Sequence, residues 1–366
     1  MINKKLGFGC LRLPMQTGSV DEKQFCAMID RYLDAGFNYF DTAHGYIGGL
    51  SEKSLRKCLC ERYPRESFML TDKLTEPYFH SQKDIRPFFE EQLRLCGVDY
   101  FDYYLMHAQG AGNYDKFQKC RAYETAAELK AEGKIRHVGI SFHDRAEVLE
   151  RILNDHPEIE AVQIQFNYLD YDDAAVQSRK VYEVCRRYDK PVLVMEPVKG
   201  GALADLPPAA ASVIKALRGG SPASYAIRYA AGFDGVIGVL SGMSTLAQVE
   251  DNISYMQDFR PLDEKETMAI AQVCAIIRSV NMIPCTSCRY CIEGCPKNIS
   301  IPDLFSCMNV KKIYNNWNAD YYYHDVHTVN NGKASDCIQC GRCERVCPQH
   351  LKIRELLRKV ADEFEK

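Results

Sequence analysis

The chain has 366 residues, enough for roughly two to three average domains, or for one large α/β barrel with a smaller domain after it. It is 46% hydrophobic and 26% charged, which is typical of folded globular proteins and excludes disordered, collagen-like and coiled-coil chains. Lys and Arg total 46 against 49 Asp and Glu, so the charge balance gives no reason to expect nucleic acid as a partner.

The sequence contains no segment that predicts a secretory signal or a membrane span. Gly7, Gly9, Arg12 and Pro14 interrupt the apolar run that a signal peptide would need. No uninterrupted apolar stretch approaches the ~18 residues of a membrane helix. We therefore expect a cytoplasmic protein, and because cytoplasmic thiols stay reduced, the 17 cysteines require an explanation other than disulfides.

Short apolar runs alternate with amphipathic stretches over the first 260 residues. Eight runs predict strands, at residues 6–13, 37–43, 68–74, 100–108, 137–142, 161–167, 191–197 and 236–242. Amphipathic stretches predict helices between them, among others at 21–36, 82–97 and 171–189. Eight strand-helix units predict an α/β fold, a (β/α)8 TIM barrel. The alternative is a doubly wound open sheet, but no G-x-G-x-x-G follows the first strand.

Four polar residues lie at or just after three consecutive predicted strands. They are Asp41, Tyr46, Lys73 and His107. In a barrel the carboxyl ends of the strands meet at one rim, so we expect these side chains to converge there as catalytic residues. A lysine ammonium beside a tyrosine favours the phenolate and makes the proton easier to give to a carbonyl oxygen. Asp41 would orient Lys73, and His107 would donate a hydrogen bond to the substrate.

The remaining residues form a second region that is rich in cysteine. We predict a barrel over 1–262 and, over 263–366, a linker helix followed by a smaller, mostly helical domain. Two runs of the form C-x2-C-x2-C-x3-C-P predict two [4Fe-4S] clusters, because this is the ligand spacing of two-cluster bacterial ferredoxins. In those ferredoxins the last cysteine of each run binds the other cluster. One cluster would thus take Cys285, Cys288, Cys291 and Cys347, and the other Cys337, Cys340, Cys343 and Cys295. Zinc is the alternative, but two cysteine triplets suit it poorly.

Motifs along the whole barrel resemble the aldo-keto reductase family. They include FDTAHGY around Asp41 and Tyr46, LTDKL at Lys73, YYLMHA at His107, and GKIRHVGISFH, QIQFNYLD, EPVKGG and SGMSTLAQVEDN further along. The tail further resembles the subgroup of this family that is fused to a C-terminal two-cluster ferredoxin-type domain. The resemblance implies an NADP(H)- or NAD(H)-dependent oxidoreductase that reduces an aldehyde or ketone, or oxidises the alcohol, with Tyr46 as proton donor.

The resemblance also implies where the nicotinamide cofactor binds. Three residues fall where the family holds the nicotinamide ring, namely Ser141, Gln163 and Met195. Five more fall where the family binds the adenosine half, namely Gly242, Ser244, Gln248, Asp251 and Asn252.

The combination of the two regions leaves three hypotheses open. Nicotinamide moves two electrons as a hydride and each cluster moves one, so direct exchange needs an intermediary, for which a flavin is a candidate. In the first hypothesis the clusters relay electrons to or from an electron-transfer partner protein. In the second the clusters are purely structural. In the third the protein is a nicotinamide-binding redox sensor without turnover.

Overall fold

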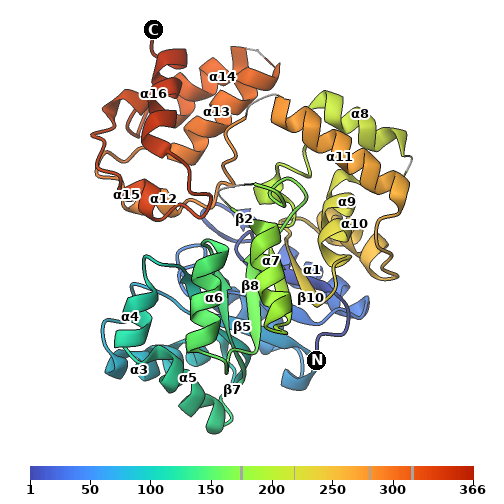
Figure 1. Cartoon of the computed structure of the whole chain (residues 1–366), viewed down its shortest axis with the longest axis vertical. Coiled ribbons are helices and arrows are strands. Elements are labelled where there is room, and N and C mark those ends of the chain that lie inside the picture. The colour runs from blue at the N-terminus through green and yellow to red at the C-terminus, as the bar shows by residue number, and fades with distance from the viewer. Residues whose placement is uncertain (174–175, 218, 280–281, 315–316) are drawn as a thin grey trace. The chain divides into compact units, whose positions relative to one another are not determined.

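The computed structural model describes residues 1–173, 176–217, 219–279, 282–314 and 317–366, and shows two compact units (Figure 1). The first contains Met1–Pro197 and Ala223–Leu262, and the second contains Val198–Pro222 and Asp263–Lys366. A segment from the middle of the chain therefore groups with the C-terminal residues.

Eight parallel strands close into a barrel in the first unit, in the order β1-β10-β9-β8-β7-β6-β5-β4. The strands are β1 (Leu6–Gly9), β4 (Tyr39–Asp41), β5 (Met69–Leu74), β6 (Phe101–Gln109), β7 (Ile135–Phe142), β8 (Ala161–Gln165), β9 (Val192–Met195) and β10 (Val236–Gly242). The predicted barrel is confirmed. The first strand ends at Gly9 and not at Leu13, because the chain turns away after its last partner, Gly242 of β10.

Aromatic and aliphatic side chains fill the interior of the barrel. Tyr39 and Tyr103 are buried there with their ring centroids 6.2 Å apart, edge to face. The Tyr39 hydroxyl accepts a hydrogen bond from Thr71 Oγ1 at 2.9 Å. Gly139 of β7 has no room for a side chain, since a Cβ atom there would lie 2.5 Å from the Ala161 oxygen. The barrel is thus a packed core, and its chemistry is left to the strand ends.

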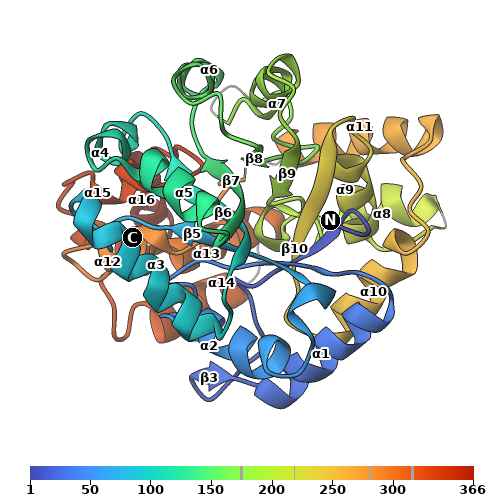
Figure 2. The same cartoon turned by 90° about the horizontal axis from the view of Figure 1, so that it is seen from below.

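Helices surround the strands (Figure 2). In the first unit they are α1 (Glu22–Asp34), α2 (Leu50–Leu55), α3 (Gln82–Cys96), α4 (Tyr114–Lys119), α5 (Ala122–Ala131), α6 (Ala146–Asp155), α7 (Ser178–Arg187), α9 (Pro222–Ala231) and α10 (Leu246–Met256). The helix predicted over 171–189 begins seven residues later than expected. Among the described residues before it, Asp173 accepts a hydrogen bond from the Val176 amide through its side chain at 2.9 Å, which is a turn contact; residues 174–175 lie outside the described part of the chain.

The second unit is mostly helical. Its longer helices are α8 (Pro208–Ala216), α11 (Glu264–Ser279), α13 (Ile301–Tyr314) and α16 (Ile353–Phe364), and two one-turn helices, α12 (Tyr290–Glu293) and α15 (Arg342–Arg345), each contain a cysteine. α8 packs against α11 (Figure 1). A second group of helices shares an apolar core that includes Leu304, Phe305, Leu357 and Val360. In the described part of the chain, no helix combines the length and the apolar character that crossing a membrane requires.

Candidate functional site

The carboxyl ends of three neighbouring strands bring the predicted catalytic residues together. Asp41 is the last residue of β4, Lys73 lies on β5 and His107 lies on β6. Tyr46 follows β4 in the loop before α2, and its backbone amide donates to the Ala43 oxygen at 3.1 Å. Parallel pairing of β4 with β5 and of β5 with β6 places these ends side by side.

Lys73 is fully buried and is held by oxygen atoms. Its Nζ donates to Asp41 Oδ1 and to the Thr42 carbonyl oxygen, both at 2.6 Å. The same Nζ lies 5.1 Å from the centroid of the Tyr46 ring. The Asp41 carboxylate compensates the buried ammonium, which lies beside the tyrosine. This arrangement suits Tyr46 to the transfer of a proton.

The His107 ring lies against the Tyr46 ring. The two ring centroids are 6.1 Å apart at 70°. Burial, with added repulsion from Lys73 and His143, holds the pKa of His107 well below its ordinary value, so the imidazole is neutral at pH 7. His107 Nδ1 shares a hydrogen bond with Thr75 Oγ1 at 2.8 Å. In the tautomer that accepts this bond, Nε2 carries the proton and can donate it to a substrate oxygen.

A second buried layer lies behind Lys73, and the sequence analysis missed it. Gln92 Nε2 donates to the Lys73 carbonyl oxygen at 3.0 Å. Asp72 Oδ1 accepts from the Lys73 backbone amide at 2.8 Å. Glu52 and Asp72 form a carboxyl pair in which burial raises both pKa values, that of Glu52 to about 7. These residues come from helices and from the outer face of β5, so strand-end positions alone could not indicate them.

The residues predicted to hold the nicotinamide ring lie at the ends of the next three strands. Ser141 Oγ accepts from the Ala108 amide at 2.7 Å. Gln163 Nε2 donates to Asp41 Oδ2 at 2.8 Å, which links this group to the catalytic residues. These bonds do not use the Ser141 hydroxyl proton or Gln163 Oε1. A carboxamide needs one donor and one acceptor, and this pair fits it. Met195 ends β9 and is partly buried.

The residues predicted for the adenosine half lie at the end of β10 and on α10. Ser244 N donates to Gln248 Oε1 at 2.7 Å, and Ser244 Oγ donates to the Arg12 carbonyl oxygen at 2.8 Å. Asp251 follows on α10, while Asn252 is buried and donates to Ser241 Oγ at 2.7 Å, so it supports the loop from within.

Arg12 is a basic residue that the sequence analysis did not assign to this site. Its side chain approaches Gly242, where an added Cβ would lie 3.3 Å from Arg12 Cδ. The parallel pairing of Gly9 with Gly242 brings it there, since Arg12 follows Gly9 by three residues. The sequence between Ser241 and Asn252 has no Lys or Arg, so inspection of that segment alone misses this guanidinium.

Four cysteines from both ends of the C-terminal region line a first pocket in the second unit. They are Cys285, Cys288, Cys291 and Cys347. Thr286, Phe305 and Gln349 are among the other residues of its wall. The structure therefore brings together the four residues that the sequence analysis assigned to one cluster, including the cysteine taken from the second run.

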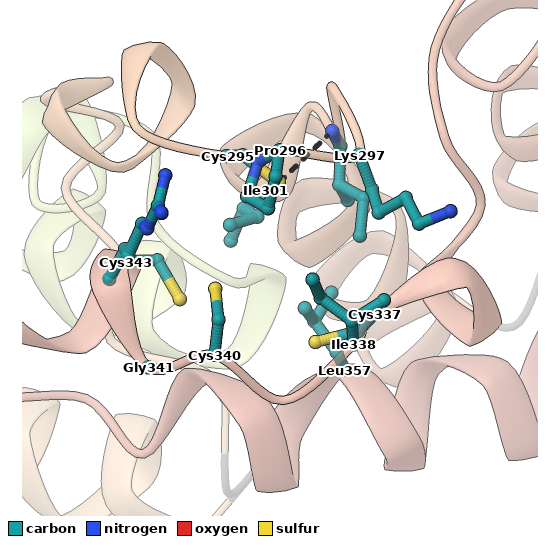
Figure 3. Close-up of a pocket in the computed structure, with 12 residues that line it drawn as sticks. Cys295, Pro296, Lys297, Ile301, Cys337, Ile338, Cys340, Gly341, Cys343 and Leu357 are labelled. Carbon is teal, nitrogen blue, oxygen red and sulfur yellow. Dashed lines mark hydrogen bonds between the residues drawn. The ribbon is translucent and has the colours of Figure 1, made fainter.

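The other four cysteines line a second pocket. Figure 3 shows the sulfur atoms of Cys337, Cys340 and Cys343 directed into a common space below Cys295. Cys295 Sγ accepts a hydrogen bond from the Ile299 amide at 3.4 Å. Four sulfur atoms around one space are a donor set that suits a [4Fe-4S] cluster in each pocket. The nine remaining cysteines lie elsewhere in the chain.

The two cysteine runs repeat the same backbone conformation. Arg289 and Gly341 each adopt a positive φ, 67° and 72°, immediately before the short helix that carries the third cysteine. Asn298 and His350, three residues after the last cysteine of each run, adopt φ values of 50° and 49°. Position for position, Lys297 of the first run therefore corresponds to Gln349 of the second.

Comparisons with known proteins match two regions of the chain. The family model "Aldo/keto reductase family" matches residues 5–275, and the model "4Fe-4S dicluster domain" matches residues 284–351. The chain is 26% identical to L-galactose dehydrogenase of Arabidopsis thaliana over 75% of this chain and 91% of that protein. It is 29% identical to the NADH-specific methylglyoxal reductase of Escherichia coli, over 52% of this chain and 61% of that protein.

Solved structures are similar in the same region. The holo form of an aldo-keto reductase from Bacillus halodurans superposes with a TM-score of 0.59 at 26% identity, covering 74% of this chain and 92% of that one. An aldo-keto reductase from Klebsiella pneumoniae in complex with NADPH gives a TM-score of 0.61 at 22% identity, covering 75% and 95%. At that identity the second similarity concerns the fold alone.

Proposed function

Because the chain belongs to the aldo/keto reductase family, we propose that it reduces the carbonyl group of an aldehyde or ketone, or oxidises the corresponding alcohol, with a nicotinamide cofactor. One observation supports this above the others. The buried Lys73 ammonium, fixed by Asp41 Oδ1 at 2.6 Å, lies beside the Tyr46 ring at the rim of the barrel. That geometry serves the transfer of a proton to a carbonyl oxygen.

Each residue of this group has a distinct role in the proposed reaction. When bound, the nicotinamide supplies or accepts the hydride. The Tyr46 hydroxyl donates its proton to the substrate oxygen, and the Lys73 ammonium stabilises the phenolate that remains. Asp41 fixes the position of Lys73. The neutral His107 donates Nε2–H to the same substrate oxygen and orients the carbonyl.

The cofactor would be held at the ends of the following strands. The Ser141 hydroxyl and Gln163 Oε1 would bind the carboxamide, and Met195 would pack on the ring. Ser244, Gln248 and Asp251 would bind the adenosine half, with Gly242 leaving room for it and Asn252 supporting the loop. Arg12, whose side chain lies beside Gly242, would meet a 2′-phosphate in this proposal, which would favour NADP(H) over NAD(H).

We further propose two [4Fe-4S] clusters in the second unit, one in each cysteine pocket. The clusters would accept and release single electrons. Since a hydride carries two, exchange with the nicotinamide requires a one-electron carrier such as a flavin, and the clusters would otherwise serve an electron-transfer partner protein. A cytoplasmic location, where thiols stay reduced, is part of this proposal.

The test replaces Tyr46 by phenylalanine. Tyr46→Phe removes the proton donor but leaves Lys73 and Asp41 in place, so carbonyl reduction should fall at least ~100-fold. Rates would be followed anaerobically by the loss of reduced nicotinamide, with methylglyoxal and benzaldehyde among the carbonyls tried. Nicotinamide binding, followed by fluorescence titration, should stay within about twofold.

Tyr188→Phe is the matched control. The Tyr188 hydroxyl donates to Asn154 Oδ1 outside the proposed site, so this variant should keep the rate of the natural protein. Near-normal activity of Tyr46→Phe would show that the proton comes from another residue. An equal loss in both variants would mean that the effect is not specific to the proposed donor.

A further inference from the structure

A buried amide and a buried lysine lie at the first cysteine pocket, and neither belongs to the cysteine motif. Gln349 lines the pocket with its side chain 4% exposed, and Lys199 is 2% exposed. Lys199 Nζ donates to Gln349 Oε1 at 2.8 Å. Lys199 follows β9 in the chain, so it reaches this pocket from the segment between the seventh strand of the barrel and α8.

The lysine decides which way the amide points. An ammonium group only donates hydrogen bonds, so the Gln349 oxygen must face it and the amide nitrogen must face away. Gln349 Nε2 is buried and has no hydrogen-bond partner among the described residues. A buried N–H donor without an acceptor is costly, and such groups are rare in folded proteins. Because Gln349 lines the first pocket, a group bound there could supply the acceptor.

The loop that carries Lys199 is held against the pocket by its backbone. Gly200 has a φ of 66°, and an added Cβ there would lie 2.2 Å from the Thr286 carbonyl oxygen. Thr286 is the residue after Cys285 and also lines the pocket. Two independent contacts, Lys199 with Gln349 and Gly200 with Thr286, thus fix this loop behind the first pocket.

The second pocket lacks this arrangement. Lys297 occupies the position that corresponds to Gln349, and it is exposed. Arg342 is the other charged residue of that wall, and it is also exposed, so solvent screens both charges. Cys340 and Ile338 are exposed as well. The two pockets therefore offer unequal environments to the same kind of cluster.

We propose that Gln349 donates an N–H···S hydrogen bond to the first cluster and that Lys199 fixes this donor, so that the first cluster has a higher reduction potential than the second. Reduction adds one negative charge, and a hydrogen-bond donor and a buried cation both stabilise the reduced form. Lys199 and Gln349 are positioning residues in this scheme. The inference rests on the proposed presence of two [4Fe-4S] clusters.

The test is a redox titration of the full chain, purified without oxygen and followed by electron paramagnetic resonance, with dithionite and mediators. The natural protein should show two separate midpoints. Gln349→Leu and Lys199→Met should each lower the higher one, changing the ratio of reduced to oxidised cluster at fixed potential at least tenfold, or about 59 mV for a one-electron couple. Lys297→Leu, the matched control, should leave both midpoints unchanged.

Iron analysis of each variant separates loss of the cluster from a change in its potential. If Gln349→Leu loses iron, Gln349→Glu keeps the oxygen that Lys199 holds and removes the donor, and its higher midpoint should still fall. If every Gln349 variant loses iron, the test rests on Lys199→Met, whose higher midpoint should fall. Unchanged midpoints in variants that retain both clusters overturn this inference alone. Iron for fewer than two clusters in the natural protein, or zinc in their place, overturns the proposed cluster content as well.

Discussion

Lys73 carries its charge in a fully buried position, and the groups around it divide into two kinds. Asp41 compensates the charge directly, with Nζ and Oδ1 2.6 Å apart. Glu52 and Asp72, on the other side, are carboxyl groups whose burial disfavours the charged form. A proton bound to this pair relieves both the burial of charge and the repulsion between the two carboxylates. The folded protein therefore binds this proton more tightly than the unfolded chain.

The sign of the pH dependence follows from the Glu52 pKa, which rises from 4.5 to about 7 on folding. Below pH 4.5 Glu52 is protonated in both the folded and the unfolded state, so its titration does not change the free energy of unfolding. Between pH 4.5 and about 7 the folded state keeps a proton that the unfolded state has released. The free energy of unfolding therefore falls as the pH rises through this range, by roughly 3 kcal/mol in total. Glu52→Gln abolishes this penalty. The melting temperature of the variant relative to that of the natural protein should therefore be higher at about pH 8.5 than at about pH 5.5.

Glu183→Gln is the control for this comparison, since Glu183 lies on α7 with an exposed side chain. Its melting temperature should differ from that of the natural protein by the same amount at both pH values. A pH-independent difference for Glu52→Gln would mean that Glu52 is ionised throughout.

The sequence analysis identified the residues that act at the rim but not the residues that support them. Asp41, Lys73 and His107 end predicted strands, and any barrel brings such ends together. Thr75 and Gln92 touch the same group from a loop and a helix. Their positions depend on how each helix turns against the barrel, which periodicity does not determine. Arg12 was missed because strand pairing places it beside Gly242.

At the scale of elements, the close packing of β7 on its neighbours depends on the absence of one side chain. A Cβ at Gly139 would meet the Ala161 oxygen of β8 at 2.5 Å and Leu105 Cδ2 of β6 at 2.7 Å. The first of these atoms is backbone in the barrel sheet and has little freedom to move. Apolar runs predicted all eight strands, yet this requirement for glycine comes from contacts between strands and is not visible in any one of them.

Gly139→Ala should therefore destabilise the barrel by about 1–3 kcal/mol, the usual cost of overpacking a core. Gly112→Ala is the control, because a Cβ there meets nothing within 4 Å, and its effect should stay within about 0.5 kcal/mol. The barrel transition in calorimetry, followed in the full chain, measures both. Equal midpoints for the two variants would show that β7 and β8 move apart at little cost.

For the whole molecule, we expect the fold of the second unit to depend on the proposed clusters. Apolar core residues such as Phe305 and Leu357 line the cysteine pockets, so an emptied pocket becomes a cavity inside a small core. We expect about eight iron atoms per chain after purification without oxygen. Removing them with ferricyanide and a chelator should lower the helical circular dichroism signal, while the barrel continues to bind nicotinamide.

Four iron atoms per chain would limit the protein to one cluster, and zinc would remove the electron-transfer function altogether. Unchanged circular dichroism after complete iron removal would show that the helices of the second unit fold without clusters. In each case nicotinamide binding by the same sample reports whether the barrel stayed intact.

Because Val198–Pro222 belongs to the second unit, the protein cannot be divided into its two units by a single cut in the chain. Truncation after Leu262 would leave α8 in the product but delete α11, against which it packs. The face of α8 that packs on α11 would be uncovered, and Lys199 would lose its hydrogen-bond partner Gln349. The two segments of the second unit are thus separated in the chain by part of the barrel, Ala223–Leu262. A transplantable module would have to carry both segments, and a stop codon at the apparent boundary would yield a damaged protein instead of an ordinary reductase.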